Sequence, residues 1–376
     1  MSVIIKAGKV ILTFCLVVSC LLVMAAAPAL CHFWLFLRLP AKPSFETRQF
    51  FIPPKSGAFG VARLLESQEV VRDARAFYFL AWLRNSLHRL QAGEYAFSTL
   101  YTPEQVLDQI VNGRVVIHTA TLPEGSTIWD VARIFEQKDL APSADFLKLA
   151  GSAEFIKSLG LKAGSLEGYL FPETYHFKKP LDEAAIIRAM VREFWRNMPR
   201  DWAERAREVG LNLHEVVTMA SIIEKEAIVD SERPVIAGVF YNRLKIKMPL
   251  QSDPTAVYDI PGFSGPVLAA HLSRQSPYNT YQIKGLPPGP ICSPGAKSLK
   301  AALSPEKVPY FYFVSNNDGT HTFSVTVAEH QQAVGRYYRL KKKAAEEKDT
   351  REGPKPAQTD PSTNGPGAAE ESGPAP

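Results

Sequence analysis

The segment IPPKSGAFGVARLLESQEV (residues 52–70) recurs in altered form as LPEGSTIWDVARIFEQKDL (residues 122–140). Aligned without gaps, the two segments share a proline, a serine, a Val-Ala-Arg run and a glutamate. In both, apolar residues recur at i and at i+3 or i+4, which is the spacing of an amphipathic helix. Self-similarity of this kind indicates a repeated structural unit. Chance resemblance between two amphipathic helices is the alternative.

The residues that follow each copy extend the repeat. A second apolar helix comes next, and then a strand-like Tyr-x-Phe, at residues 95–97 in the first copy and 169–171 in the second. Pro103 and Pro180, each followed closely by an acidic residue, then open a further helix. The sequence therefore predicts the order strand, helix, helix, strand twice.

The N-terminus has the pattern of a membrane anchor. Lys6 and Lys9 precede an apolar run, VILTFCLVVSCLLVMAAAPAL (residues 10–30), that exceeds the length of about 20 residues needed to cross a bilayer. The lysines favour an N-terminus on the inside and an exported body. A cleaved signal peptide is the alternative, but the apolar run continues past residue 30 into FWLFL. We predict a retained single-pass anchor in the inner (cytoplasmic) membrane, contacting the lipid bilayer, with the body on the outer or periplasmic side.

Composition narrows the class of protein. Of the 376 residues, 46% are hydrophobic and 22% are charged, which is typical of a folding chain, and the net charge of +5 is mild. No basic run with interleaved aromatic residues occurs, so we predict no nucleic-acid partner. Cys292 is the one cysteine remote from the anchor, which excludes a disulfide framework in the body. No CxxC or HExxH motif occurs, and we predict neither a metal nor another cofactor.

The end of the chain has a different composition. From residue 350 the sequence is TREGPKPAQTDPSTNGPGAAEESGPAP, which contains no aromatic or large aliphatic residue. Such a segment cannot bury enough apolar surface to offset the entropy of the chain. We predict a basic stretch followed by a disordered tail over residues 341–376.

The segment with the most unusual charge placement is TMASIIEKEAIV (residues 218–229), in which two glutamates stand among aliphatic residues. The surrounding pattern predicts one helix over residues 214–229 and another over residues 233–244. Ser231 would cap the second helix, and Pro234 would lie in its first turn.

The two acids, Glu224 and Glu226, are two residues apart and so point to different faces of a helix. This excludes the close carboxylate pair of a retaining glycosidase. Because an ionised carboxylate among aliphatic groups is costly, we expect burial to raise the pKa of Glu224 and to let it donate a proton near neutral pH. The alternative is that one glutamate is solvated and the other pairs with Arg233 or Arg243. The expected neighbours of Glu224 on its helical face are Val217, Ala220, Ser221 and Ile228.

Several motifs resemble, in the same order, those of the MltG or YceG-like endolytic murein transglycosylases. They are LEGYLFPETY (166–175), SIIEKEAIVDSERPVIAGVFYNRL (221–244), LQSDPTAVY (250–258), SPYNTY (276–281), GLPPGPICSPG (285–295) and HTF (321–323). The resemblance spans roughly residues 166–338. The turn-plus-helix halves of the repeat also resemble the LysM module, a small glycan-binding unit, and an anchor followed by such units fits the layout of the family.

The resemblance implies cleavage within peptidoglycan glycan strands, between N-acetylmuramic acid and N-acetylglucosamine. The family's catalytic glutamate matches Glu224. It would protonate the glycosidic oxygen and then take the proton of the C6 hydroxyl, whose oxygen closes on C1 to give a 1,6-anhydro end. Gln251, Tyr278 and Asn279 look like the Gln-bearing turn and Tyr-Asn pair of lysozyme-like transglycosylases, which bind substrate. Asp253 is either a turn former or a further substrate ligand.

The resemblance also implies a biological role and partners. The enzyme would terminate or trim nascent peptidoglycan strands and would couple to glycan-synthase complexes. Two other functions remain as alternatives. One is a catalytically silent glycan-binding scaffold. The other is a hydrolytic muramidase, which needs a second carboxylate such as Glu167, Glu173 or Asp253.

These observations predict an α+β protein with an N-terminal membrane anchor, duplicated LysM-like α+β units, and a mostly helical catalytic domain with small β elements near residues 310–325. The expected boundaries are residues 1–9 for a cytoplasmic N-terminus, 10–37 for the transmembrane anchor, 48–117 and 118–185 for the two LysM-like repeats, 186–340 for the transglycosylase catalytic domain and 341–376 for the tail.

Overall fold

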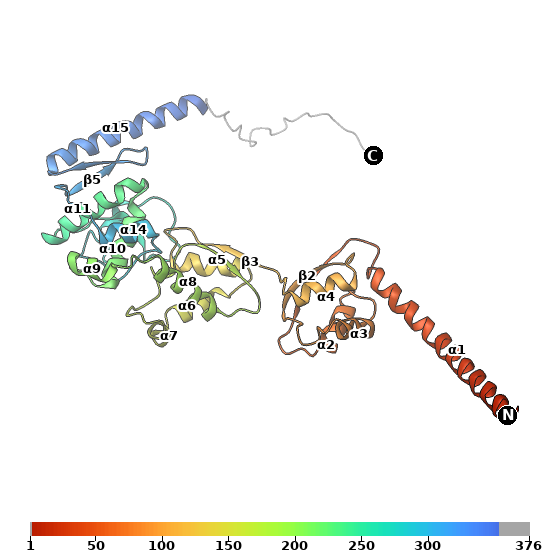
Figure 1. The fold of residues 1–376 in the computed structure, drawn as a ribbon. Helices are drawn as coiled ribbons and strands as arrows, with labels where there is room; N and C mark the ends of the chain where they lie inside the picture. Colours follow the sequence, from red (N-terminus) through yellow and green to blue (C-terminus); the bar gives the residue numbers. More distant parts are fainter. Residues whose placement is uncertain (1, 353–376) are drawn as a thin grey trace, which may run out of the picture.

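The computed structural model describes residues 2–352. Figure 1 shows these residues as a row of parts: the helix α1, a first small unit, a second unit, and a helical half that leads to α15. The described residues form mostly α-helices, with three two-stranded antiparallel sheets. The chain is therefore mixed α+β and mostly helical, as predicted.

Helix α1 (Ser2–Arg38) contains the predicted anchor and projects away from the other elements in Figure 1. Its segment Leu16–Arg38 has a mean hydropathy of 2.2 and is long and apolar enough to cross a membrane. The end of α1 contacts the first unit. Phe36 is buried there, and the ring of Phe33 meets the ring of Phe79 edge-on at a centroid distance of 5.1 Å.

The first unit contains β1 (Thr47–Ile52), α2 (Ala58–Ser67), α3 (Ala74–Leu83), β2 (Gly93–Ser98) and α4 (Pro103–Val111). Strands β1 and β2 pair antiparallel, with Phe50 opposite Tyr95. The helices bury their apolar faces in a hydrophobic cluster that includes Leu65, Phe77 and Phe97. This cluster belongs to the first unit and the end of α1 alone.

The second unit contains β3 (His118–Thr121), α5 (Ile128–Gln137), α6 (Ser143–Ala150), α7 (Ala153–Ser158), β4 (Thr174–Phe177) and α8 (Glu183–Asn197). Strands β3 and β4 pair antiparallel, with Ala120 opposite Tyr175. Asp182 caps α8, which confirms the helix expected after Pro180. The apolar stretch that follows α5 forms two short helices, because α6 ends at Ala150 with Gly151 as its C-cap and Ser152 caps α7.

The predicted position of the second strand is wrong. Tyr169 and Phe171 lie in non-strand backbone ahead of β4, and Tyr175 takes the strand position instead. The tyrosine hydroxyls show the true correspondence. Tyr175 donates to the carbonyl of Phe171 at 2.6 Å, as Tyr95 donates to the carbonyl of Gln91 at 3.0 Å.

With this correction the two units correspond position by position. Helices α2 and α5 begin and end at equivalent residues of the gapless alignment. The other equivalent features, first unit then second, are the serine hydroxyls of Ser56 and Ser126 bonded to a preceding proline carbonyl, the left-handed Lys55 and Gly125, and the left-handed Glu69 and Asp139. The predicted order is thus observed in both copies, with the second helix of the second copy divided in two.

The helical half contains α9 (Trp202–Val209), α10 (Leu213–Glu226), the 3-10 turn η1 (Asp230–Glu232), α11 (Arg233–Lys245), α12 (Asp253–Val257), α13 (Ala269–Leu272) and α14 (Ala296–Leu303). Helix α10 packs against α9, α11, α12 and α14. One hydrophobic cluster runs from β3 through the second unit into these helices. The second unit therefore shares its core with the helical half, whereas the first unit does not.

Two helix boundaries in this half differ from prediction. Helix α10 ends at Glu226, ahead of the expected residue 229, because the backbone of Ala227 is extended. Glu232, the last residue of η1, takes the cap position of α11 in place of Ser231. Pro234 is in the first turn of α11, as expected.

The last elements are β5 (Tyr312–Ser315), β6 (His321–Ser324) and α15 (Val327–Glu352). Strands β5 and β6 pair antiparallel and form the β element expected near residues 310–325. Helix α15 lies against β5, as Figure 1 shows. It includes the basic stretch from residue 341, and the rest of the predicted tail, residues 353–376, lies outside the described residues.

Candidate active site

Helix α10 brings both glutamates to one end of the helical half. Asn212 and Glu215 form a capping box that fixes its start, with bonds of 3.1 and 2.8 Å, and its middle turns are buried. Glu226 is the last residue of α10. It therefore lies at the negative end of the helix dipole, where further negative charge is disfavoured.

The carboxylate of Glu224 is buried and bonded by protein donors on both oxygens. Its side chain is 6% exposed. Oε1 accepts a hydrogen bond from Nη1 of Arg233 at 3.2 Å, and Oε2 accepts one from the backbone N–H of Gly295 at 2.9 Å. The same Arg233 nitrogen donates to Oγ of Ser298 at 2.8 Å. The expected burial is observed, but the surroundings are ionic, and the expected neighbour Ile228 is exposed. Glu224 thus joins α10 to α11 and to the start of α14.

The carboxyl group of Glu226 has a different environment. It is half-buried, and Oε1 accepts a hydrogen bond from the hydroxyl of Ser252 at 2.5 Å. Burial raises the pKa of Glu226 to about 7, and the nearby charge of Asp253 adds to the rise, although Ser252 and Arg243 oppose it. Within residues 2–352 its second oxygen accepts no hydrogen bond. Glu226 is therefore a carboxyl group that holds a proton near neutral pH and has an oxygen free for a ligand.

Two of the predicted substrate-binding residues lie beside Glu226. Gln251 and Asp253 are exposed and flank Ser252, the residue that bonds Glu226. The hydroxyl of Tyr281 donates to Oδ1 of Asp253 at 2.6 Å. The structure thus groups Gln251 and Asp253 with Glu226 instead of Glu224.

Ser252 and Tyr281 were not among the predicted site residues. Both lie inside quoted motifs, LQSDPT and SPYNTY, but their side-chain roles depend on how these two loops meet. Thr280 joins the loops: its hydroxyl accepts the N–H of Ser252 at 2.9 Å, and its carbonyl accepts the N–H of Gln251 at 3.1 Å. This contact between distant segments cannot be read from either motif alone.

The predicted Tyr-Asn pair lies elsewhere. Asn279 is fully buried, and its side-chain nitrogen donates to the backbone carbonyls of His271, Leu272 and Arg274. Its amide therefore holds the loop that follows α13. The ring of Tyr278 packs on that of Tyr258 at a centroid distance of 4.7 Å, and burial raises the pKa of Tyr278. In the described part of the chain, neither residue hydrogen-bonds to Glu224 or Glu226.

A third buried carboxyl group lies behind the site. Glu167 is 2% exposed, and its Oε2 accepts hydrogen bonds from the N–H of Ile128 at 3.0 Å and from the hydroxyl of Tyr258 at 2.9 Å. Burial raises the pKa of Glu167 to about 7. It links the first turn of α5 to the segment after α12. Glu173 is exposed and immediately precedes β4.

The second unit also contributes to the site through its turn ahead of α5. Nζ of Lys225 donates to the carbonyl of Gly125 at 3.3 Å. The carboxyl group of Glu124 lies directly over Gly295, where any side chain would overlap it. Burial and the charge of Glu224 raise the pKa of Glu124. Glu124 was not among the predicted site residues. The one feature of the sequence that could have drawn attention to it is a difference between the repeats, since the first unit has Pro54 at the equivalent position.

A groove of about 460 Å³ adjoins these residues, between α5 and the segment from α12 to the following loop. Lys225 and Pro254 line it, and they are the sequence neighbours of Glu226 and Asp253. Neither glutamate lines the groove, which meets α10 at Lys225, the residue between them.

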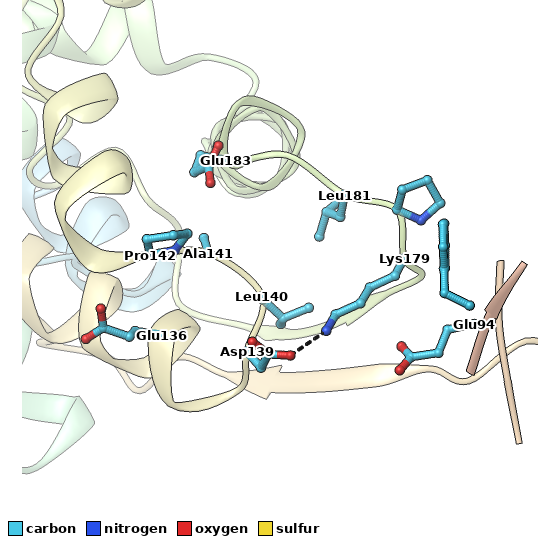
Figure 2. Close-up of a pocket in the computed structure, with 11 residues that line it drawn as sticks. Glu94, Glu136, Asp139, Leu140, Ala141, Pro142, Lys179, Leu181 and Glu183 are labelled. Atoms are coloured by element: carbon cyan, nitrogen blue, oxygen red, sulfur yellow. Dashed lines mark hydrogen bonds and ion pairs between the residues drawn. The ribbon is translucent and has the colours of Figure 1, made fainter. Parts of the chain in front are cut away.

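Figure 2 shows a larger cavity, of about 670 Å³, between the first and second units. Its lining includes one lysine, Lys179, which pairs with Asp139 at 2.8 Å. An acid-rich wall whose lysine is already paired is a poor site for an anionic ligand. Neither Glu224 nor Glu226 lines it. The lining carboxylates are Glu94, Glu136, Asp139 and Glu183.

Comparisons with known proteins identify relatives of this chain. The model of the YceG-like family matches residues 50–336. A protein named endolytic murein transglycosylase from Bacillus subtilis (strain 168) is 32% identical over 314 residues, covering 79% of this chain and 86% of that protein. A protein of the same name from Streptococcus pneumoniae serotype 2 (strain D39 / NCTC 7466) is 29% identical over 322 residues, covering 77% of this chain and 58% of that protein. The crystal structure of a YceG-like protein from Listeria monocytogenes is 35% identical, with a TM-score of 0.53, and covers 77% of this chain and 99% of that one.

Proposed function

The chain belongs to the YceG-like family, and from this we propose that it is an endolytic murein transglycosylase that cleaves bonds between N-acetylmuramic acid and N-acetylglucosamine within peptidoglycan strands. The names of its relatives support this activity. The products would carry 1,6-anhydro-muramic ends. One acid that first donates and then accepts a proton is sufficient for this reaction, because no water is consumed.

The observation that carries the assignment of the acid is the environment of Glu226. A general acid must be protonated at working pH and within reach of the substrate. Glu226 has a pKa of about 7 and an oxygen without a protein donor, whereas both oxygens of Glu224 are bonded by Arg233 and Gly295. We therefore propose Glu226 as the acid in place of Glu224, which the apolar pattern of the helix and the family resemblance both predicted.

In this mechanism the proton of Glu226 moves to the glycosidic oxygen as the bond from that oxygen to C1 breaks. The resulting carboxylate then takes the proton of the C6 hydroxyl of the same muramic residue, and the C6 oxygen bonds to C1. Ser252 fixes one carboxyl oxygen in place. Gln251 offers an exposed amide for N-acetyl or hydroxyl groups, and Asp253, oriented by Tyr281, offers an acceptor for sugar hydroxyls.

We assign a separate role to each part of the chain on the basis of its two hydrophobic cores. α1 would hold the protein in the inner membrane as a single-pass anchor, with the body on the outer side, where it could meet glycan-synthase complexes. We propose that residues 48–117 and 118–185 are LysM-like units. Since only the second shares a core with the helical half, the first would extend the reach from membrane to glycan, and residues 118–340 would form the working enzyme.

The test compares Glu226→Gln with Glu224→Gln in purified full-length protein digesting cell-wall sacculi, with products read by mass spectrometry. Glutamine keeps the size of the side chain but cannot exchange a proton. We expect Glu226→Gln to lower formation of anhydro ends by about 10²–10⁴-fold without lowering thermal stability near neutral pH, because glutamine cannot ionise. Glu224→Gln leaves a buried arginine partly uncompensated, so it should lower the melting temperature and retain activity while the protein stays folded.

The opposite result, an inactive Glu224→Gln and an active Glu226→Gln at temperatures where both are folded, would return the acid to Glu224. If neither change matters, a non-catalytic glycan-binding scaffold replaces the enzyme. Products without the anhydro bond would identify a hydrolytic muramidase instead.

A further inference from the structure

The groove between α5 and α12 has one feature that the proposed chemistry does not use, an exposed tryptophan. Trp129 lies in the first turn of α5, and its side chain is 44% exposed while its ring stands 5.3 Å from that of Tyr258. We propose that this groove is a saccharide-binding subsite in which the indole of Trp129 stacks on an N-acetylhexosamine of the strand next to the cleaved bond. This inference rests on the proposed function for its substrate class.

The groove has the size and position for such a subsite. Its volume of about 460 Å³ lies within the range of about 300–1,000 Å³ common for ligand pockets. One wall is the first turns of α5, and the other is the segment from Pro254 to Phe263. Lys225 lines it beside Glu226. A strand with one sugar in the groove would therefore pass the end of α10 that carries Glu226.

The walls of the groove are held rigidly. Thr127 and Asp130 cap α5 reciprocally, with bonds of 3.2 and 3.0 Å, so the helix turn that carries Trp129 is fixed. The opposite wall is fixed through Tyr258, whose hydroxyl donates to Glu167. Glu167 also accepts the N–H of Ile128, the neighbour of Trp129. One buried carboxyl group thus ties both walls together, and a preorganised site loses less entropy on binding.

The chemistry of the lining suits a largely neutral sugar. An aromatic face packs against the apolar face of a sugar ring, and polar groups around it can bond hydroxyl and N-acetyl groups. The charged side chains of the lining balance, since Arg133 and Lys225 match Asp130 and Asp259. Arg133 pairs with Asp130 at 2.7 Å at the rim. Because the charges of the lining balance, the groove does not favour a strongly charged ligand of either sign.

The first unit supplies a matched control at the equivalent position of the repeat. Phe59 aligns with Trp129, is likewise 44% exposed, and packs on Tyr78 at a ring centroid distance of 5.7 Å. Phe59 does not line the groove, since all the lining residues belong to the second unit and the helical half. A change at Phe59 therefore removes an exposed aromatic group of the same kind without touching the groove.

The experiment measures binding of an N-acetylglucosamine hexamer to the full-length chain in detergent, in a Glu226→Gln background so that nothing is cleaved. Trp129→Ala should weaken binding roughly tenfold, Trp129→Phe should retain most of the affinity, and Phe59→Ala should bind like the parent. Because Trp129→Ala could perturb α5, tryptophan fluorescence gives a second readout: the hexamer should change it in the parent and not in Trp129→Phe.

Unchanged affinity in Trp129→Ala, an equal loss in Phe59→Ala, or a fluorescence change that persists in Trp129→Phe would each overturn the subsite. The proposed function is judged separately, by anhydro ends formed from sacculi by the protein with Glu226 intact. If those ends are absent but Trp129→Ala still weakens binding, the groove stands as a glycan site and only the enzyme is refuted.

Discussion

The first and second units have one fold but different surroundings. In each, a two-stranded sheet joins strands of equivalent register, and a tyrosine of the second strand bonds a carbonyl just before that strand. The first unit closes its own core with α4 and the end of α1. The second continues its core into α10 and α14 of the helical half. The same scaffold therefore closes a separate core in one place and shares the core of the helical half in the other.

The two units differ in the turn ahead of their first helix. The turn ahead of the first helix has Pro54 and Lys55 in the first unit, and Glu124 and Gly125 in the second. In the second unit the turn contacts Lys225, next to both acids of α10. Since fold and function are separable in this way, the repeat alone does not reveal which copy takes part in catalysis.

The largest expected effect separates the two cores. Phe135 and Leu65 are equivalent and fully buried. Phe135→Ala should cost about 3–5 kcal/mol and Leu65→Ala about 2–5 kcal/mol, because each leaves a cavity. Phe135→Ala should lower the unfolding transition at which activity is lost, whereas Leu65→Ala should lower a separate transition. Calorimetry combined with activity after heating measures both.

Two outcomes would contradict the independence of the two units. If the chain unfolds in one transition that both variants lower equally, or if Leu65→Ala abolishes activity below its melting temperature, the two units are not independent. Chemical unfolding followed through a single labelled cysteine in each unit would then locate the coupling.

The next effect depends on pH and should appear in the second unit alone. Glu167 has a folded pKa of about 7 against 4.5 unfolded, so its contribution to stability is fully present below pH 4.5 and is lost as pH rises to about 7. The loss amounts to roughly 3 kcal/mol. Glu226 acts in the same direction. Glu167→Gln should therefore show a smaller fall in unfolding free energy between pH 4.5 and 7.

The first unit is the internal control for this prediction. Among its described residues the buried polar side chains are Ser86 and Thr99, and no carboxylate is buried. Its transition should lack this loss between pH 4.5 and 7. Two results would contradict the role of Glu167. One is an equal loss of unfolding free energy in both transitions, and the other is a Glu167→Gln variant whose unfolding free energy changes with pH as it does in the parent.

The sequence was sufficient for the local elements of this comparison. Amphipathic spacing and capping residues identified the paired helices, the start of α8 and the two helices around the EKE motif, because these signals act over a few residues. The Tyr-x-Phe pattern was ambiguous, since it occurs at both 169–171 and 175–177. Only pairing with β3 selects the second occurrence.

The site was less predictable for the same physical reason. Helical spacing correctly separated the faces of Glu224 and Glu226, but it could not show that Arg233 and Gly295 would bond one and Ser252 the other. Those contacts join segments that are far apart in sequence. From the sequence, we expected burial alone to raise the pKa of Glu224. Its contacts with Arg233 and Gly295 depend instead on how α11 and α14 pack against α10.

The smallest expected effect tests the repeat at its most similar contact. Glu66 accepts the N–H of Ala74 at 3.1 Å, and Glu136 accepts the N–H of Ser143 at 3.0 Å, so each glutamate bonds the start of the next helix. The two helices differ in their other caps. Asp73 also bonds the start of α3, whereas Pro142 gives α6 no side-chain bond.

Glu136 therefore stabilises its helix start without help, and Glu66 has a partner. Glu136→Ala should cost about 1–2 kcal/mol in the transition of the second unit, within the range of a lost helix cap, and Glu66→Ala about 0.5 kcal/mol in that of the first. Glutamine at either position keeps an acceptor oxygen and should restore most of the loss. Equal costs for the two alanine variants in urea unfolding would mean that Asp73 adds nothing to the cap. The two units would then be equivalent at this contact as well as in fold.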